Sequence, residues 1–209
     1  AVGVDFACAL LRDETVSCWG NAEYGALGAV TRDRTDAPVQ VRAGDGHALD
    51  HATAIFAGDG RACALRDGVV WCWGAGDFGQ LGDGVARELP TLVTVRAPEA
   101  MADGISDATS LAAGARHACL VRNDGRIVCW GNNGDGRLGD GTHLDRSAPT
   151  YLALPTVRFT AVTAGERHTC ALDRDAGVWC WGANEHGQCG PEGSAREVPQ
   201  RVPLPARAR

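Results

Sequence analysis

Residues 113–141 read AGARHACLVRNDGRIVCWGNNGDGRLGDG, a phrase that the chain carries four times. The other copies begin at Val2, Ala57 and Ala164, and the tryptophans of their Cys-Trp-Gly motifs stand 54, 57 and 51 residues apart. A period near 50 residues, made of short strands and Gly-rich turns, is typical of β-propeller blades and differs from the helical stripes of solenoids. We therefore predict an all-β protein of four blades in one domain, with repeats at residues 1–54, 55–110, 111–161 and 162–209.

Further segments complete each repeat. A Pro-x-x-Val or Pro-x-x-Leu segment follows every copy and predicts an additional short strand; these segments begin at Pro38, Pro90, Pro149 and Pro199. The repeats differ in length mainly through two polar inserts, Ala43–His51 and Pro98–Asp107, which we expect to be loops between blades.

The hairpin turns predict the register of the central strands. Asp67-Gly68 is typical of a two-residue hairpin loop, which places Cys63 opposite Cys72. Asn123-Asp124-Gly125 suits a three-residue loop with Gly in the left-handed position. Three-residue loops pair Cys119 with Cys129, Cys8 with Cys18, and Cys170 with Cys180.

Opposed strand residues lie close to disulfide geometry, so we predict that all four cysteine pairs are cross-strand disulfides. The alternative is four pairs of buried reduced thiols. Zinc is disfavoured because the spacing lacks a C-x2-C knuckle with a second pair nearby. The ninth cysteine, Cys189, stands where the other copies have Leu27, Leu81 and Leu138, and we interpret it as an apolar substitute, the alternative being a free or intermolecular thiol.

The same register predicts sheets that are apolar on both faces. One face places each motif tryptophan opposite a small residue: Trp19 and Ala7, Trp73 and Ala62, Trp130 and Ala118, Trp181 and Thr169. The cysteine face carries Leu10 and Val16 in the first copy and similar residues in the others. Such a sheet has to be covered on both sides, as in radially stacked blades.

Charge and hydropathy exclude several classes of protein. With 20 basic and 26 acidic residues the net charge is −6, which argues against a nucleic-acid binder that works by phosphate neutralisation. No run of eighteen apolar residues exists, so we expect no membrane insertion. The paired cysteines predict an oxidising, extracytoplasmic location: secreted, periplasmic or cell-surface.

Each copy resembles the regulator of chromosome condensation repeat, which runs Ala-Gly-x-x-His, an apolar strand, Asp-Gly, a strand ending in Trp-Gly, Asn-x-x-Gly-Gln-Leu-Gly and a Pro-x-x-Val strand. The third copy matches through Ala113-Gly114, His117, Asp124-Gly125, Trp130-Gly131-Asn132 and Leu138-Gly139-Asp140-Gly141-Thr142. The departures are Phe6 and Arg61 in place of His, Cys189 in place of Leu, and the additional paired cysteines. Propellers of this family have seven blades, so the resemblance implies that these four form an open arc or a fragment of a seven-bladed propeller.

The resemblance implies a protein-binding scaffold without catalysis. Bacterial proteins of this family include an inhibitor of a secreted enzyme, so the resemblance also implies inhibition of a secreted enzyme as one form of such binding. An alternative is a guanine nucleotide exchange factor-like regulator of a small GTPase, whose wedge would have to come from one of the two inserts. An enzyme is the third class, but no hydrolase, metalloprotease or phosphate-loop motif is present, so we assign no catalytic, cofactor or metal residue.

Two surface hypotheses remain. Arg116-His117 and Arg167-His168 recur at the start of a strand and are candidates for a partner-binding rim; the alternative is that the histidine bonds backbone at a blade junction while the arginine is solvated. An arc also leaves its end blades uncovered, which predicts self-association or further blades. The uncovered residues would be either Phe6, Leu10 and Val16 or Ala7, Leu11 and Trp19 at one end, and either Leu172 and Val178 or Trp179 and Trp181 at the other.

Overall fold

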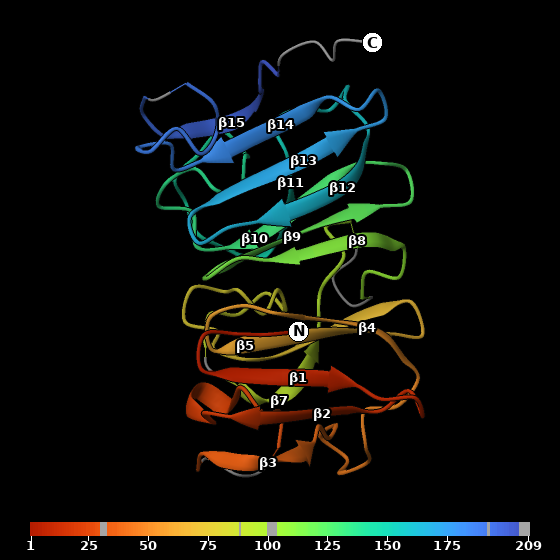
Figure 1. Cartoon of the computed structure of the whole chain (residues 1–209). Helices are drawn as coiled ribbons and strands as arrows, with labels where there is room; N and C mark the ends of the chain where they lie inside the picture. Colours follow the sequence, from red (N-terminus) through yellow and green to blue (C-terminus); the bar gives the residue numbers. More distant parts are fainter. Residues whose placement is uncertain (30–32, 88, 100–103, 192, 205–209) are drawn as a thin grey trace.

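The computed structural model describes residues 1–29, 33–87, 89–99, 104–191 and 193–204. Its strands form antiparallel sheets that stack face to face (Figure 1). Three sheets have four strands each, in chain order: β4 (Ala52–Ala57), β5 (Arg61–Arg66), β6 (Val69–Gly74) and β7 (Leu89–Thr94); β8 (Ala108–Ala113), β9 (His117–Arg122), β10 (Ile127–Gly131) and β11 (Arg146–Tyr151); β12 (Phe159–Ala164), β13 (His168–Asp173), β14 (Val178–Gly182) and β15 (Arg196–Arg201). These are the second, third and fourth blades.

The first blade has three strands, β1 (Phe6–Leu10), β2 (Val16–Gly20) and β3 (Thr35–Gln40), with a short 3-10 turn at Glu23–Gly25. Ala1 and Val2 take the place of an innermost strand. The Ala1 amino group donates to the Cys8 carbonyl at 2.9 Å, the Cys8 amide donates to the Ala1 carbonyl at 2.9 Å, and Val2 bridges Ala7. Val2 thus pairs with Ala7 as Ala57 at the end of β4 pairs with Ala62 in the second blade.

The predicted register is confirmed in every blade. Cys63 pairs with Cys72 and Trp73 with Ala62 across β5 and β6, and the other copies pair in the same way. Disulfides join all four opposed cysteine pairs, with sulfur–sulfur distances from 2.07 to 2.13 Å. The Pro-containing segments form the outermost strands β3, β7, β11 and β15, where proline is tolerated because an edge strand needs fewer backbone donors.

The sheets pack in one repeated manner: the cysteine face of each blade lies against the tryptophan face of the next. Cys8 and Cys18 share a core cluster with Trp73, Cys63 and Cys72 share one with Trp130, and Cys119 and Cys129 share one with Trp181. Trp73, Trp130 and Trp181 are completely buried. The expectation that both faces are covered is therefore confirmed for the inner junctions.

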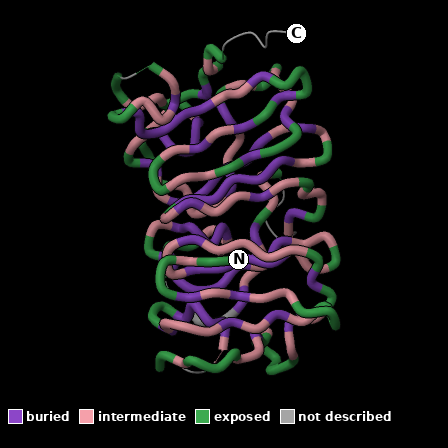
Figure 2. The backbone as a smooth tube through the Cα atoms, viewed as in Figure 1, coloured by how far each residue is buried: buried purple, intermediate pink, exposed green. Residues whose placement is uncertain are grey.

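The stack is an open arc. β3 and β15 lie at its opposite ends (Figure 1), and exposed residues lie mainly in the loops along the two sides (Figure 2). Since Phe6 and Val16 are buried against the second blade, the uncovered face at the first end is the one that carries Ala7, Leu11 and Trp19. At the other end it is the cysteine face with Leu172 and Val178, because Trp179 and Trp181 pack against the third blade.

The first insert, Ala43–His51, is a tight turn whose end packs into the core. Arg42 bridges Ala48, the Ala43 amide donates to the His47 carbonyl at 2.9 Å, and Leu49 is fully buried. It therefore has no projecting wedge. The second insert, Pro98–Asp107, lies partly outside the described residues, which omit 100–103. Within the part of the chain that is described, no helix has the length and apolar character needed to cross a bilayer.

Candidate partner-binding rim

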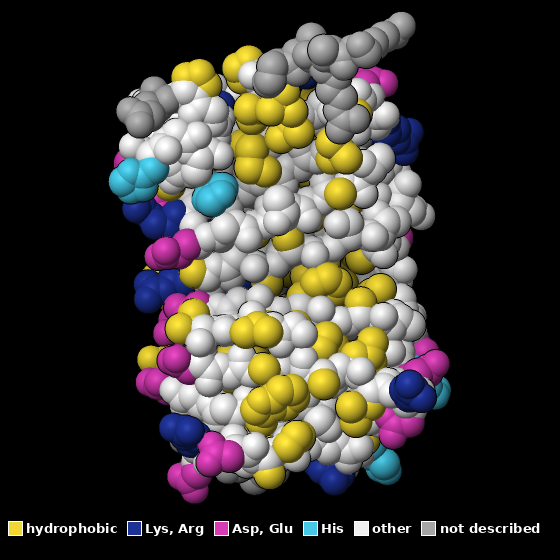
Figure 3. All heavy atoms as spheres, viewed as in Figure 1, with side chains coloured by type: hydrophobic (Ala, Val, Ile, Leu, Met, Phe, Trp, Pro, Cys, Tyr) yellow, Lys and Arg dark blue, Asp and Glu magenta, His cyan; other side chains and the backbone are white. Residues whose placement is uncertain are grey.

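One long edge of the stack, which we call the loop rim, consists of the turns at residues 58–60, 114–116 and 165–167 and the loops at 21–25, 75–79, 132–136 and 183–187. Strand direction places them together, because in every blade the strand with the first cysteine begins, and the strand with the second cysteine ends, at this edge. Basic and acidic side chains alternate along the left edge of Figure 3, where these loops lie. The rim is therefore a polar surface shared by all four blades.

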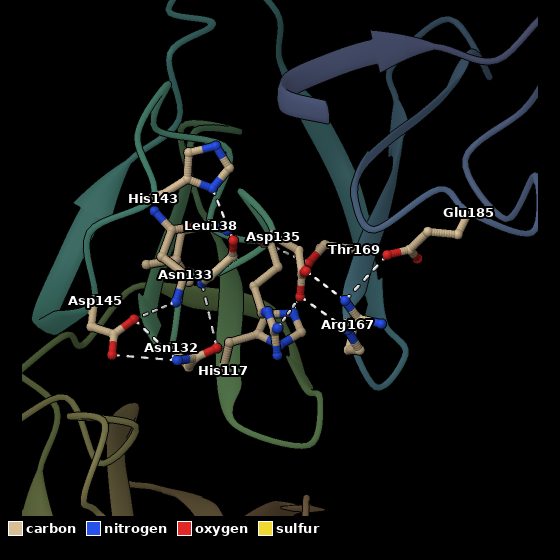
Figure 4. A network of polar contacts seen from close by, with 12 residues as sticks. His117, Asn132, Asn133, Asp135, Leu138, His143, Asp145, Arg167, Thr169 and Glu185 are labelled. Carbon is tan, nitrogen blue, oxygen red and sulfur yellow. Dashed lines mark hydrogen bonds and ion pairs between the residues drawn. The ribbon is translucent and has the colours of Figure 1, made fainter. Parts of the chain in front are cut away.

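The two arginines predicted for the rim are exposed there, and neighbouring blades hold both of them. Arg116 lies 5.0 Å from the ring centroid of Phe78 in the preceding blade. Arg167 donates to Asp135 of the preceding blade at 2.6 Å and to Glu185 at 3.2 Å (Figure 4). The hydrogen bond from Arg167 is the main reason that the pKa of Asp135 lies below its usual value. Both arginines thus have defined orientations across blade junctions.

His117 does not belong to this surface, which corrects the prediction. Its side chain is completely buried and its Nε2 lies 2.8 Å from the Thr169 hydroxyl of the next blade. Because that hydroxyl donates to the Arg137 carbonyl at 3.0 Å, it accepts from His117, and the imidazole carries its proton on Nε2. Burial, reinforced by the positive charges of Arg61 and Arg137, holds the pKa of His117 well below 6.5. The ring is a neutral link between blades.

His168 occupies the same position in the last blade and is half-buried. Burial lowers its pKa. No sheet of the described residues packs against the far side of this blade, and no hydrogen bond to the His168 side chain exists among these residues. Its ring lies close to Gly165 in the rim turn, and its place in a partner-binding rim stays a prediction.

Arg61 is a junction residue that sequence reasoning missed. It stands at the histidine position of the second blade, is completely buried, and donates to the carbonyls of Ala115, at 2.7 Å, and His117 in the third blade. Loss of hydration lowers its pKa to about 10. The sequence did contain a signal for this role: Arg61 aligns with His117, so it stands at a position whose side chain reaches the next blade.

A second missed set of residues shapes the rim loops (Figure 4). Asn133 is buried, accepts from the Leu138 amide at 3.0 Å and donates to the Thr142 carbonyl at 2.9 Å. His143 lies 2.9 Å from both the Gly134 carbonyl and the Glu197 carboxylate, and Glu197 is the main cause of its raised pKa. Asn184 repeats the role of Asn133 by accepting from the Cys189 amide at 2.8 Å. These side chains hold the backbone of the rim loops by hydrogen bonds.

Cys189 is buried and unbonded, and its sulfur lies 3.4 Å from the Ala183 carbonyl. Burial raises its pKa to about 11, which makes it a poor nucleophile. Leu27, Leu81 and Leu138 are equally buried, so Cys189 fills the same apolar position, and its thiol is also free, as the alternative had it. No cluster of three or more metal-ligating side chains occurs in the described parts of the chain.

Comparison with known proteins decides the family. A family model described as the regulator of chromosome condensation (RCC1) repeat matches residues 67–121, 124–172 and 175–209, and a second model of this repeat matches residues 108–137 and 159–188. The chain belongs to the RCC1 repeat family. This RCC1-type propeller is 33% identical over 205 residues to the ultraviolet-B receptor UVR8 of Arabidopsis thaliana, covering 97% of the chain and 45% of the receptor. It is 29% identical to the human E3 ubiquitin-protein ligase HERC2, covering 96% of the chain and 4% of the ligase.

Solved structures show the same fold. Prp20p of Saccharomyces cerevisiae, whose structure was described with its binding to Gsp1p and histones, superposes with a TM-score of 0.80 at 24% identity, over 97% of this chain and 49% of Prp20p. Human WBSCR16 superposes with a TM-score of 0.81 at 20% identity, over 98% of this chain and 52% of that one. The RCC1-type propeller described here thus spans about half the length of these solved structures.

Proposed function

We propose that this RCC1-type propeller is a scaffold that binds another protein through its loop rim and turns over no substrate. The observation that carries the proposal is the set of exposed charges on the rim whose orientations are set by neighbouring blades. Arg116 lies over Phe78, and Arg167 is held between Asp135 and Glu185. A surface of fixed, alternating charge selects partners by complementarity and needs little ordering when it binds.

Comparison with solved structures also supports protein binding. The family relative Prp20p was described with its binding to Gsp1p and histones, and a yeast RCC1 structure contains bound Kap60. These are properties of those proteins, and they support protein binding as the class of function for this chain. Inhibition of a secreted enzyme is one concrete form that such binding could take.

We further propose an extracytoplasmic location: secreted, periplasmic or cell-surface. The four disulfides support it, because such bonds persist in oxidising compartments and are rare in the cytosol. Every blade contains one such bond, so an oxidising compartment would stabilise all four blades.

Site-specific photo-crosslinking tests the rim proposal. Glu166 and Asp175 are both exposed and lie beyond opposite ends of β13, one on the rim and one in the hairpin turn. A photoreactive amino acid at each position, introduced into protein in its native compartment, should give a covalent adduct with a specific protein from position 166 and none from position 175. The adduct partner should then bind the purified chain, and Arg167→Glu should weaken that binding.

The control for that step is Arg126→Glu, since Arg126 is a half-exposed arginine at the opposite edge of the third blade. Equal weakening by both substitutions would refute the rim as the binding surface. An adduct that forms only at position 175 would do the same, and chemical conversion of the bound protein by the chain would refute the scaffold role.

A further inference from the structure

The three junctions between blades share one polar contact. The tryptophan indole of each blade donates to a backbone carbonyl in the loop of the preceding blade: Trp73 to Ala26 at 3.0 Å, Trp130 to Gln80 at 3.0 Å and Trp181 to Arg137 at 2.9 Å. Two residues after each carbonyl comes a glycine, and a Cβ on Gly28, Gly82 or Gly139 would lie 2.8–2.9 Å from the indole nitrogen. These three repeated bonds indicate that a glycine loop against a tryptophan fixes each junction.

The last two junctions share a second contact, between a loop of one blade and the outermost strand of the next. The Gly84 amide donates to the Ser147 carbonyl of β11 at 2.8 Å, and the Gly141 amide donates to the Glu197 carbonyl of β15 at 3.0 Å. Both bonds join backbone groups, which do not titrate. The stacking of the outermost strands is therefore independent of pH at this point.

At the junction between the third and fourth blades a side-chain bridge accompanies this backbone contact. The His143 Nδ1 lies 2.9 Å from the Gly134 carbonyl in the loop rim, and its Nε2 lies 2.9 Å from the Glu197 carboxylate on β15. In the preceding copies of the repeat Ala86 stands at the position of His143, and Ser147 stands at the position of Glu197. Alanine cannot form such a bridge, so the stacking of blades does not require it.

The two partners of the His143 ring determine its charge. A carbonyl oxygen and a carboxylate oxygen both accept hydrogen bonds, whereas a neutral imidazole has a single N–H to donate. Only the imidazolium, which has two N–H groups, satisfies both contacts. The hydrogen bond to Glu197, and after it the bond to the Gly134 carbonyl, raises the pKa of His143 above its ordinary value of 6.5, and the negative charge of Asp135 contributes as well.

The other charged groups around the bridge have partners that persist near neutral pH. They are Asp135, which is paired with Arg137 and Arg167; Asp140, which is paired with Arg146; and Asp145, which accepts from the Asn132 side chain and the Asn133 amide. His117 and His168 lie nearer the strands, and their pKa values are lowered, so both rings are neutral at that pH. Of these groups, only His143 changes its charge near neutral pH.

The bridge reaches the loop rim through the Gly134 carbonyl. Gly134 lies between Asn133, whose amide donates to Asp145 at 2.7 Å, and Asp135, which binds Arg167 of the fourth blade. Figure 4 shows His143 beside the loop that carries Asn133 and Asp135. The protonated ring thus ties this rim loop to the fourth blade at a second point, next to the ion pair of Asp135. A neutral ring keeps only one of its two contacts, and the tie is broken.

We propose that His143 is a pH-dependent clamp, which when protonated holds the rim loop at residues 132–136 to β15 and so favours partner binding at the loop rim. The regulation of binding rests on the proposed function of the rim, whereas the clamp itself does not. The bridge needs the charged ring, so it is complete at acidic pH and is lost as the pH rises through the pKa of His143. Partner binding at the rim should therefore weaken in the same pH range.

Histidine NMR on the purified 209-residue chain tests the clamp. The chain has six histidines, and His143→Asn identifies the signal of His143. That signal should titrate above pH 6.5, and the backbone amides of Gly134 and Asp135 should shift with the same midpoint. Glu197→Gln keeps the size of the side chain and removes its charge, so it should move both midpoints down toward 6.5.

His51→Asn is the matched control, since His51 is an exposed histidine that lies 3.5 Å from the Asp67 carboxylate at the opposite edge of the stack. This variant should leave the titration of the Gly134 amide unchanged. A midpoint of His143 at or below 6.5, or a Gly134 amide that does not follow it, would overturn the clamp. The clamp would also be wrong if Glu197→Gln left the midpoint where it is in the wild type.

Photo-crosslinking from position 166 at about pH 5.5 and about pH 8.5 tests the regulation. The wild type should give more adduct at the lower pH, and His143→Asn should give equal yields relative to each other at the two values. A pH dependence of the partner itself would appear in both proteins, so a ratio that is the same for wild type and His143→Asn would overturn the regulation while the rim stands. Absence of an adduct at both pH values would refute the rim function and the regulation with it, and the NMR titration would still decide the clamp.

Discussion

Trp130→Phe tests how much an inner tryptophan contributes to the fold. Phenylalanine keeps an apolar ring in the junction but removes the indole nitrogen that donates to the Gln80 carbonyl at 3.0 Å. Gln80 is 2% exposed and Trp130 fully buried, so the carbonyl is left in the interior without its donor. An unsatisfied buried acceptor costs about 1–3 kcal/mol.

The missing part of the ring adds a cavity cost of about 1 kcal/mol, so the free energy of unfolding should fall by about 2–4 kcal/mol in total. This is a large share of the stability of a typical domain, about 5–15 kcal/mol. The matched control is Trp19→Phe. Because the Trp19 face is half-exposed and its indole has no partner in the described structure, we expect a change within about 0.5 kcal/mol.

Equilibrium unfolding in urea, followed by far-UV circular dichroism, measures both variants. A blade array need not unfold in one step, so the comparison should use the transition midpoint and its slope together. Equal losses from Trp130→Phe and Trp19→Phe would show that the junction contact contributes nothing beyond ring burial, and the inference from the three repeated bonds would then be wrong.

Three other perturbations follow from the structure. Denaturation without reductant, followed by alkylation and intact mass measurement, should modify only Cys189 of the nine cysteines; nine modified thiols in protein from its native compartment would contradict the disulfides. The pKa of His117 is lowered in the folded state, so the unfolded chain binds more protons than the folded chain as the pH falls below about 6.5. The free energy of unfolding should therefore drop by up to about 1.4 kcal/mol per pH unit below that pH. Melting curves of His117→Asn should show a flatter pH dependence than those of the wild type. Gly139→Ala should lower the melting temperature more than Gly141→Ala, because both have positive φ but only at Gly139 would a Cβ lie 2.8 Å from the Trp181 indole nitrogen. Equal effects of the two glycine variants on the melting temperature would show that backbone strain alone accounts for the loss and that the contact with the indole contributes nothing.

Much of the fold could be predicted because its determinants are local. A two-residue turn at Asp67-Gly68 and three-residue turns elsewhere determine which strand residues face one another, and hence the cysteine partners nine or ten residues apart. The candidate site was harder to predict from the sequence. Arg116 and Arg167 were placed correctly at an exposed edge, but His117 is buried, and the loop contributions of Asn133 and His143 were not foreseen.

The repeat, the all-β class, the hairpin register and the paired cysteines could be read from the order of residues, since each depends on residues that a short turn brings together. Which face of a blade meets the next became known from the packed sheets alone, and with it which faces lie at the two ends of the stack. The indole contacts join residues 44 to 50 positions apart, and the links of Arg61 and His117 join residues 52 to 56 positions apart. At that separation the local alternation of residues is the same for either face. Packing removes this ambiguity, because each inner tryptophan lies against a glycine loop only when the tryptophan face of a blade packs on the cysteine face of the preceding blade.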